Sequence, residues 1–330
     1  MDEQNPYRQP DAEAAPASRF FALVLSAPRR RPMVRALVWW GQAWKLFWRR
    51  PLGWLVAAFA WWLVVMVVQF VSLVIPFLGS VVVFVLMPVF GAGLLQLAHT
   101  LNRGEGLYIG DIFAGFHYKA GPLCGVGVLF LVLMIGIFVV PMGTGLILFS
   151  GDIVSAVASD GQAASAAPDN MADQGMSLRA GVWALTFMAT LVVAGAMVGF
   201  APALVYFTDI DPGRALVESL KAVLLNILPF TVYGIVLIAL SLMIIMTPLL
   251  LFFLLDILGV VGLGFVELQD TGLESWLAAL GAWVVALMFA VVLGYLWVMV
   301  MVTLSIYTAL RDIFPGSEPE PDSGSFGKVH

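Results

Sequence analysis

The chain is poor in the residues that build most active sites and metal sites. It has one cysteine, Cys124, and three histidines, His99, His117 and His330. A single cysteine excludes an intramolecular disulfide, and the few Cys and His residues form no cluster with the spacing of a structural metal site. The sequence also contains no H-E-x-x-H, G-x-S-x-G or P-loop motif. We therefore expect no catalytic residue, no cofactor and no metal ion, and the protein is not predicted to be an enzyme.

Charged residues are scarce as well, at 11% of the chain against 61% hydrophobic residues. A soluble globular domain carries roughly 25% charged residues, so the composition excludes that class. The sequence contains six long uncharged runs, each exceeding the ~20 apolar residues that cross a bilayer as a helix. This pattern predicts an all-α integral membrane protein with six transmembrane helices. The expected spans are about 53–75, 78–99, 123–149, 181–206, 229–255 and 277–306.

The six spans belong to one transmembrane domain, 33–310, which lies between two polar ends. We expect residues 1–32 and 311–330 to be disordered cytoplasmic segments, because their outer parts are rich in Pro, Gly, Ser and Glu. Between the third and fourth spans, residues 152–179 are rich in Ala, Ser, Gly and Asp without periodicity. This composition predicts a flexible loop.

Positive charge is distributed very unevenly between the two sides of the predicted membrane domain. With the N-terminus in the cytoplasm, fifteen of the sixteen Lys and Arg residues fall in cytoplasmic segments. Only Arg179 falls on the other side. Cytoplasmic loops of membrane proteins carry an excess of this kind. The distribution predicts six spans with both the N-terminus and the C-terminus in the cytoplasm.

The most distinctive segment is a basic, Trp-rich stretch before the first span. Between 33 and 50, apolar residues recur at intervals of three and four, while Arg35, Gln42, Lys45 and Arg49 occupy the other side. A helix of this kind lies in the headgroup region, where indole rings sit and cations meet anionic lipid. The residues expected to contact the membrane interface are Trp40, Trp44, Lys45, Trp48, Arg49 and Arg50. The plainer interpretation is that the segment only anchors the topology.

An amphipathic cytoplasmic helix, a proline and a membrane hairpin recur three times along the chain. The helix-plus-proline segments are 33–51, 111–122 and 212–229. Proline is tolerated in the first turn of a helix, so each proline is expected to open a span. The recurrence favours a threefold repeat of helix-plus-hairpin units. The alternative is coincidence, because short interfacial helices and prolines are both common in membrane proteins.

The third of these amphipathic helices carries clear end signals. Asp211 is expected to cap its N-terminus, with Pro212 in the first helical position. Glu218 and Lys221 have the spacing of an ion pair on one helix face. We therefore expect a well-delimited helix at this point.

Ionisable side chains are missing from the middle of the predicted spans. Those nearest to them stand at span ends, where water or headgroups reach them: Asp209, Asp256, Arg311 and Asp312. A proton-coupled antiporter or an ion pump needs a buried carboxylate at mid-depth, so the sequence argues against both classes.

The second cytoplasmic segment is the strongest candidate for chemistry. It holds two imidazoles and two carboxylates, His99, Glu105, Asp111 and His117. Such a set at the inner surface could serve a lipid-modifying enzyme. Their spacing matches no known motif, and we interpret this segment as a solvated loop.

Two stretches of the first 120 residues resemble a protein family. They are Trp40-Gly41-x-x-Trp44-x-Leu46-Phe47-x-x-Arg50-Pro51-Leu52-x-Trp54, and Arg103-Gly104-Glu105 with Gly110-Asp111-x-Phe113-x-Gly115-Phe116. On these residues the chain resembles an uncharacterised family of proteobacterial multi-span inner-membrane proteins. The resemblance implies a helical fold in the bacterial cytoplasmic (inner) membrane, and it implies no activity because the family has none assigned.

The leading functional hypothesis is a non-enzymatic protein that organises its membrane surroundings. The expected partners are the lipid bilayer, in particular anionic lipids of the inner leaflet, and a membrane-protein partner, whereas nucleic acid is not expected. The rival hypothesis is a transporter of a small or lipophilic solute. Prolines such as Pro141, Pro202 and Pro248 lie within or near the spans, and interrupted helices occur at transporter binding sites.

Overall fold

The computed structural model describes residues 26–75, 78–158, 170–257 and 273–315. Within these ranges all regular secondary structure is helical. Six helices are long and apolar enough to cross a membrane, which confirms the predicted fold class and number of spans. The six apolar stretches are Pro51–Phe70, Val81–Asn102, Ala120–Gly151, Gly175–Phe207, Ile227–Leu251 and Trp283–Ile313.

The helices follow one another with short connections. In chain order they are α1 (Arg35–Arg49), α2 (Pro51–Val74), α3 (Leu78–Asn102), the 3-10 helix η1 (Ile109–Phe113), α4 (Ala114–Tyr118), α5 (Ala120–Ala158), α6 (Asn170–Gly199), α7 (Ala201–Phe207), α8 (Pro212–Leu225), α9 (Ile227–Ile257) and α10 (Leu273–Ile313). As expected, α2 begins at Pro51, whereas α5 and α9 each begin two residues before their proline.

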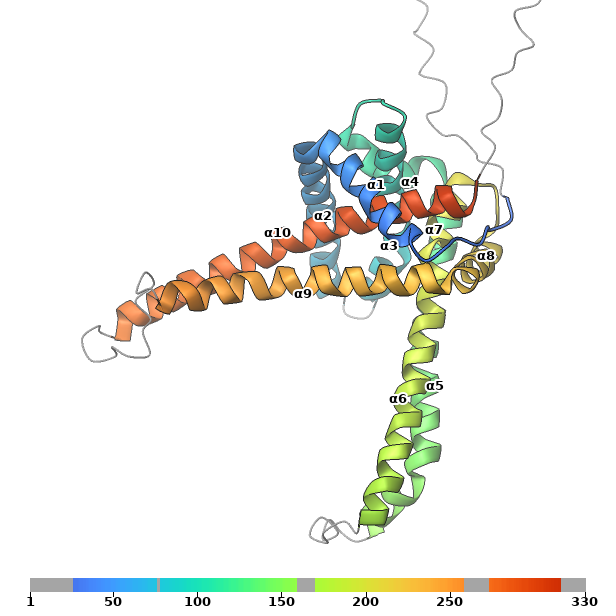
Figure 1. Ribbon diagram of the computed structural model, residues 1–330, viewed down its shortest axis with the longest axis vertical. Helices are drawn as coiled ribbons and strands as arrows, with labels where there is room; N and C mark the ends of the chain where they lie inside the picture. Colours follow the sequence, from blue (N-terminus) through green and yellow to red (C-terminus); the bar gives the residue numbers. More distant parts are fainter. Residues whose placement is uncertain (1–25, 76–77, 159–169, 258–272, 316–330) are drawn as a thin grey trace, which may run out of the picture.

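Two pairs of long helices project from a central body (Figure 1). α5 and α6 lie side by side in one pair, α9 and α10 form the other, and the two pairs leave the body in different directions. Their side chains are largely exposed: Pro229 is the one buried residue in the apolar stretch Ile227–Leu251 of α9, and few residues are buried in that of α5. Apolar helices exposed on most sides need hydrocarbon around them, which indicates a multi-pass membrane protein.

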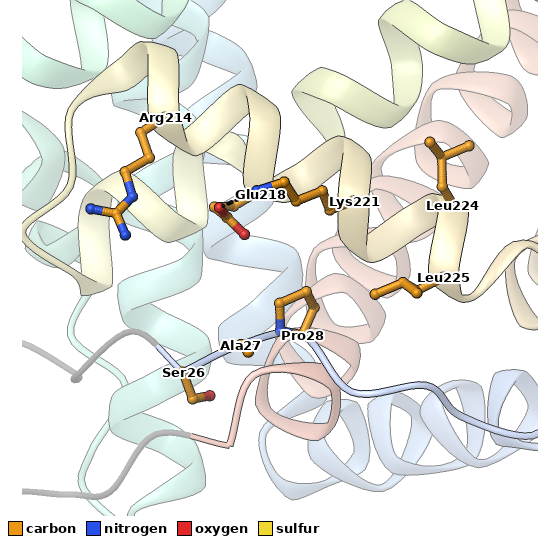
Figure 2. Close-up of a pocket in the computed structure, with 8 residues that line it drawn as sticks. All are labelled: Ser26, Ala27, Pro28, Arg214, Glu218, Lys221, Leu224 and Leu225. Carbon is orange, nitrogen blue, oxygen red and sulfur yellow. Dashed lines mark hydrogen bonds and ion pairs between the residues drawn. The ribbon is translucent and has the colours of Figure 1, made fainter.

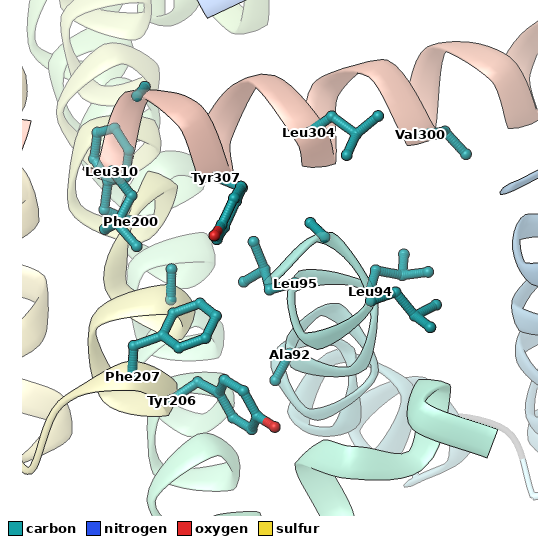
Figure 3. Packing of buried hydrophobic residues seen from close by; sticks show 14 of the residues in the cluster. Ala92, Leu94, Leu95, Phe200, Tyr206, Phe207, Val300, Leu304, Tyr307 and Leu310 are labelled. Carbon is teal, nitrogen blue, oxygen red and sulfur yellow. The ribbon is translucent and has the colours of Figure 1, made fainter. Parts of the chain in front are cut away.

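The body is built around α3, whose apolar stretch is the most buried of the six at 56%. Figure 3 shows side chains from α3, α7 and α10 meeting in one cluster, among them Leu95, Phe207, Leu304 and Tyr307. Between helices in a membrane, such side chains stabilise the structure through close van der Waals packing, because lipid is as apolar as the side chains themselves. α3 therefore holds together helices that belong to three different parts of the chain.

Two glycines set how closely η1 and α4 approach α3. A Cβ atom on Gly93 would collide with the backbone of Ile112, and one on Gly115 would collide with the carbonyl of Val89. The predicted cytoplasmic helix over 111–121 is therefore a 3-10 turn followed by the five-residue helix α4, packed directly on the α3 backbone.

The fourth predicted span, 181–206, is broken at Phe200 into α6 and α7. Pro202 lacks the N–H that would continue the helical ladder. The Ser219 hydroxyl of α8 is inserted into the ladder at this point. It accepts a hydrogen bond from the Phe200 N–H at 3.0 Å and donates one to the Ala196 carbonyl at 2.7 Å. Ser219 is fully buried, so this break ties α6 and α7 to α8.

The end signals of α8 are confirmed. The Asp211 side chain accepts a hydrogen bond from the backbone N–H of Arg214 at 3.0 Å, and Pro212 occupies the first turn. Lys221 and Glu218 are paired at 2.8 Å.

The predicted loop over 152–179 is shorter in the structure, because α5 continues to Ala158 and α6 begins at Asn170. Residues 152–158 extend the first of these helices and residues 170–179 extend the second. Only 159–169 of the predicted loop lies outside the described residues.

Replacing Ser219 with Ala is expected to lower the thermal stability of the protein. The change leaves the Phe200 N–H and the Ala196 carbonyl unpaired in a buried site, at a cost of about 1–3 kcal/mol. The measurement is thermal unfolding in detergent. Thr231→Ala is the matched control, because the Thr231 hydroxyl is exposed and bonds only to its own helix. Equal unfolding temperatures for the two variants would show that the Ser219 bridge contributes nothing.

Candidate functional site

α1 presents three faces, each in a different environment. The first packs into the body against α9 and α10: Ala36, Trp39, Trp40, Ala43, Leu46 and Phe47. The Trp39 ring lies 5.4 Å from that of Phe230, and the Trp40 ring stacks on Tyr233 at 5.2 Å. These aromatic contacts fix the orientation of α1 about its axis.

The second face of α1 is apolar and exposed. It consists of residues three and four apart: Val34, Leu37, Gly41, Trp44 and Trp48. The exposed fraction is 46% for Trp44 and 58% for Trp48, and their rings meet edge to face at 5.7 Å. The Trp44 ring also lies 6.1 Å from that of Trp297 on α10. An aromatic patch therefore continues from α1 onto the last span.

The third face of α1 is polar and contains Arg35, Gln42, Lys45 and Arg49. Five of the six residues predicted to contact the membrane interface are exposed, namely Trp44, Lys45, Trp48, Arg49 and Arg50. Trp40 differs, since only 8% of its surface is accessible. The apolar residues of α1 cover a wide arc, part of which packs on the body and part of which is exposed. The periodicity of the sequence does not show which apolar residues belong to the buried part and which to the exposed part.

The carboxylate of Asp312, near the end of α10, binds three side chains from the N-terminal part of the chain. Arg35 donates from Nε to Oδ2 at 2.9 Å and from Nη2 to Oδ1 at 2.5 Å. The Trp39 indole donates to Oδ2 at 2.9 Å, and Arg31 Nη2 lies 3.1 Å from Oδ1. The hydrogen bond to Asp312 raises the pKa of Arg35 further above its ordinary value, so this guanidinium stays charged.

The segment before α1 is bonded to the same region. Arg29 donates its backbone N–H to the Ile313 carbonyl at 2.9 Å. The backbone N–H of Arg31 donates to Asn226 Oδ1 at 2.6 Å, and Asn226 Nδ2 donates to the Arg29 carbonyl at 3.1 Å. Residues 29–31, at the end of the predicted disordered segment 1–32, are therefore held in place, whereas residues 1–25 lie outside the described part of the chain.

A polar pocket of about 410 Å³ lies where α1 meets the ends of α3 and α10. Its basic lining residues are Arg35, Lys45, Arg49 and Arg311, and its one acidic residue is Asp312. Asn102 at the end of α3 and Tyr307 on α10 complete two of its walls. The polar face of α1 thus faces a pocket between three helices.

A second pocket, of about 680 Å³, lies between the segment 26–28 and α8 (Figure 2). Arg214, Glu218 and Lys221 line its α8 side. Because Lys221 is paired with Glu218 at 2.8 Å, the charges in this pocket are largely balanced.

A buried polar group that the sequence interpretation missed lies beneath the first pocket. His99 Nδ1 is 3.2 Å from the Tyr307 hydroxyl, and the Tyr206 hydroxyl donates to Gln96 Oε1 at 3.1 Å. The prediction of a solvated loop was wrong for His99, which lies inside α3 at 6% exposure against Phe207. Gln96 and His99 are three residues apart in an apolar run, so they lie on the same face of the helix. That spacing could have predicted a buried polar pair.

Of the other candidates for chemistry, Glu105 and His117 lie on the surface of the segment between α3 and α5, whereas Asp111 is half-buried. His117 is exposed in α4, with Nδ1 2.9 Å from the Phe113 carbonyl, and Glu105 pairs with Arg103 at 3.2 Å. Within the described residues, no three His, Cys, Asp or Glu side chains are grouped as metal ligands would be. The pocket at α1 is therefore the described site with the largest excess of positive over negative side chains.

Comparisons of the chain with models of known protein families, with curated proteins and with solved structures found no match. The family resemblance described above therefore stays a prediction.

Asp312→Asn is expected to destabilise the protein by about 1–3 kcal/mol. The change removes the charge that pairs with Arg31 and Arg35, and the cost stays moderate because both arginines are partly exposed. Thermal unfolding in detergent measures the effect. Asp209→Asn is the control, since the Asp209 side chain is 79% exposed in its pair with Lys119. If both variants unfold at the wild-type temperature, Asp312 does not hold α1 on α10.

Proposed function

We propose that this protein is a non-enzymatic, multi-pass protein of the bacterial inner membrane that organises anionic lipids or a membrane-protein partner at the cytoplasmic surface. One observation carries the proposal. α1 presents an exposed aromatic face beside a cationic face, and it is fixed to the body through Asp312. A helix with these two faces matches the chemistry of the headgroup region, with indoles at the apolar boundary and cations at the phosphates.

The aromatic patch of α1 supports a membrane setting. Trp44 and Trp48 remain half-exposed although the protein buries Trp39 and Trp40 from the same helix. Trp297, beside Trp44, belongs to the apolar stretch of α10. The patch is therefore continuous with a candidate span, and Trp is enriched at this depth of membrane proteins.

The orientation in this proposal has both ends of the described chain in the cytoplasm. The hydrogen bond from Arg29 to the Ile313 carbonyl supports an even number of crossings, because the start of α1 and the end of α10 lie on the same side. The excess of Lys and Arg in the segments of that side supports the cytoplasmic assignment. α1, the η1–α4 segment and α8 would then be the three cytoplasmic surface helices, and their recurrence before each hairpin agrees with the repeat hypothesis.

Reporter fusions test the orientation. Green fluorescent protein is expected to fluoresce after Asn102 and after Pro315, and alkaline phosphatase is expected to be active after Ala158. These results follow if α3 and α10 end in the cytoplasm and α5 ends outside. Active phosphatase after Pro315 would contradict the proposed orientation.

Lipid analysis tests the proposed function. The protein is extracted in nanodiscs made directly from native membranes, and the lipids and proteins that accompany it are identified by mass spectrometry. Neutralising Lys45, Arg49 and Arg50 to Gln is expected to lower the ratio of anionic to zwitterionic lipid, because each cation near an anionic surface contributes roughly 1 kcal/mol.

The matched control neutralises three cations elsewhere, Arg103, Arg214 and Lys221. It removes the same total charge from other helices and loops, so a specific role of α1 predicts a smaller change. Equal lipid ratios in the two triple variants would argue against α1 as the contact surface.

Transport of a lipophilic solute is the second candidate, and one cavity favours it. The cavity lies between α9 and α10, has a volume of about 350 Å³ and is lined by apolar side chains around Pro248 and Trp283. α9 continues through Pro248 without a break, so the cavity itself would be the binding site. In liposomes, Pro248→Ala should then alter the rate at which the protein moves a fluorescent lipid analogue. Movement no faster than in protein-free liposomes would exclude this function for that probe.

A further inference from the structure

We propose that the pocket between α1, α3 and α10 binds one phosphate group through Lys45, Arg49 and Arg311. The inference rests on the proposed function, which places α1 among anionic headgroups, and it adds a defined site and a ligand chemistry. The phosphate could belong to an anionic lipid or to a soluble phosphate compound. Lys45 and Arg49 lie on α1 and Arg311 lies on α10. Asn102, which lines the pocket from α3, is at least 53 residues away from each of them (102 − 49 = 53), so the site exists only in the folded protein.

The excess of positive charge in the pocket favours a bound anion. Its lining contains four cations and one carboxylate, and that carboxylate is already bound by Arg31, Arg35 and Trp39. Lys45, Arg49 and Arg311 have no carboxylate partner among the residues that the structure describes. Like charges held close together repel one another, and an anion between them removes that repulsion.

The pocket also contains hydrogen-bond donors that the protein itself does not use. Arg49 uses one N–H on the Leu101 carbonyl at 3.3 Å and keeps four of the five donors that a guanidinium has. The Arg311 guanidinium lies 6.0 Å over the centre of the Tyr307 ring, within the range of a cation–π contact. Gln42 and Asn102 add neutral amides to the same lining.

These donors suit a phosphate better than a carboxylate. Arginine binds phosphate oxygens in a bidentate manner and lysine binds them as a point charge. A phosphate presents three or more acceptor oxygens in a tetrahedral arrangement, so cations from two helices can reach it together, whereas a carboxylate has two oxygens in one plane. The volume of about 410 Å³ lies within the usual range for small-molecule sites, roughly 300–1,000 Å³.

Arg311 and Arg214 provide the decisive comparison. Arg311 lies in the pocket and outside α1, whereas Arg214 is exposed on α8, outside both α1 and the lining of this pocket. A general effect of surface charge would appear equally in Arg214→Gln, and a site in the pocket would be reduced only by Arg311→Gln. Each variant removes one positive charge.

The experiment uses the whole protein in phosphatidylcholine nanodiscs. In one arm, phosphatidylglycerol is added and the number of molecules retained per protein is counted by native mass spectrometry. In the other arm, inorganic phosphate is titrated by calorimetry without the anionic lipid. We expect one phosphate-bearing ligand per protein, and we expect its affinity to fall about fivefold in Lys45→Gln and in Arg311→Gln while Arg214→Gln binds as wild type.

The two arms separate the sources of the phosphate. Retention of phosphatidylglycerol that depends on Arg311 assigns the site to a lipid headgroup, and calorimetric binding that depends on Arg311 assigns it to a soluble compound. Wild-type affinity of Arg311→Gln in both arms overturns the phosphate site, as does an equal loss in Arg214→Gln. In that case neutralising Lys45, Arg49 and Arg50 together can still lower the ratio of anionic to zwitterionic lipid. The proposed function of α1 and the phosphate site are therefore tested separately.

A charge-preserving variant distinguishes loss of the cation from loss of the fold. Arg311→Lys keeps the cation and should retain most of the binding that Arg311→Gln loses. The two variants should unfold at the same temperature, because Arg311 is exposed and forms no ion pair within the described residues. Loss of binding in Arg311→Lys with unchanged stability would contradict a site held by charge.

Discussion

The carboxylate of Asp312 connects the first helix of the protein to the last one. Arg35 and Trp39 donate to it, and Arg31 forms an ion pair with it while donating to the Asp312 carbonyl. Through this contact α1 lies against α9 and α10, its aromatic face is directed outward, and its polar face is turned toward α3. The candidate pocket, the exposed tryptophans and the common side of the two described ends all depend on this one placement.

The remaining architecture combines a well-packed body with two sparsely packed pairs of helices. α3 contacts its neighbours closely through Gly93 and Gly115, and the Ser219 hydroxyl fastens the broken fourth span to α8. The α5–α6 and α9–α10 pairs leave this body in different directions (Figure 1). Most of the polar contacts over long sequence distances are found in the body, and the pairs rely on the apolar medium that surrounds them.

The number and type of the helices follow from the sequence because each uncharged run is longer than a bilayer requires, and the α8 cap follows from Asp211. The pocket does not follow, since it needs Arg311 and Asn102 beside Lys45, and no local pattern relates positions so far apart. The glycines illustrate the same limit. Gly93 and Gly115 approach the backbone of another element closely, yet they lie on different elements and share no spacing.

The distance in sequence between Asp312 and its partners has a consequence for the order of synthesis. Asp312 is translated 281 residues after Arg31, and at ~5–20 residues per second the ribosome needs roughly 15–55 s for that interval. During this time the earlier helices are already made while Arg31 and Arg35 still lack the carboxylate that binds them in the folded protein. The N-terminal segment therefore carries two uncompensated cations until the last helix is complete, and its final position against α9 and α10 is reached only after synthesis of the chain has passed Asp312.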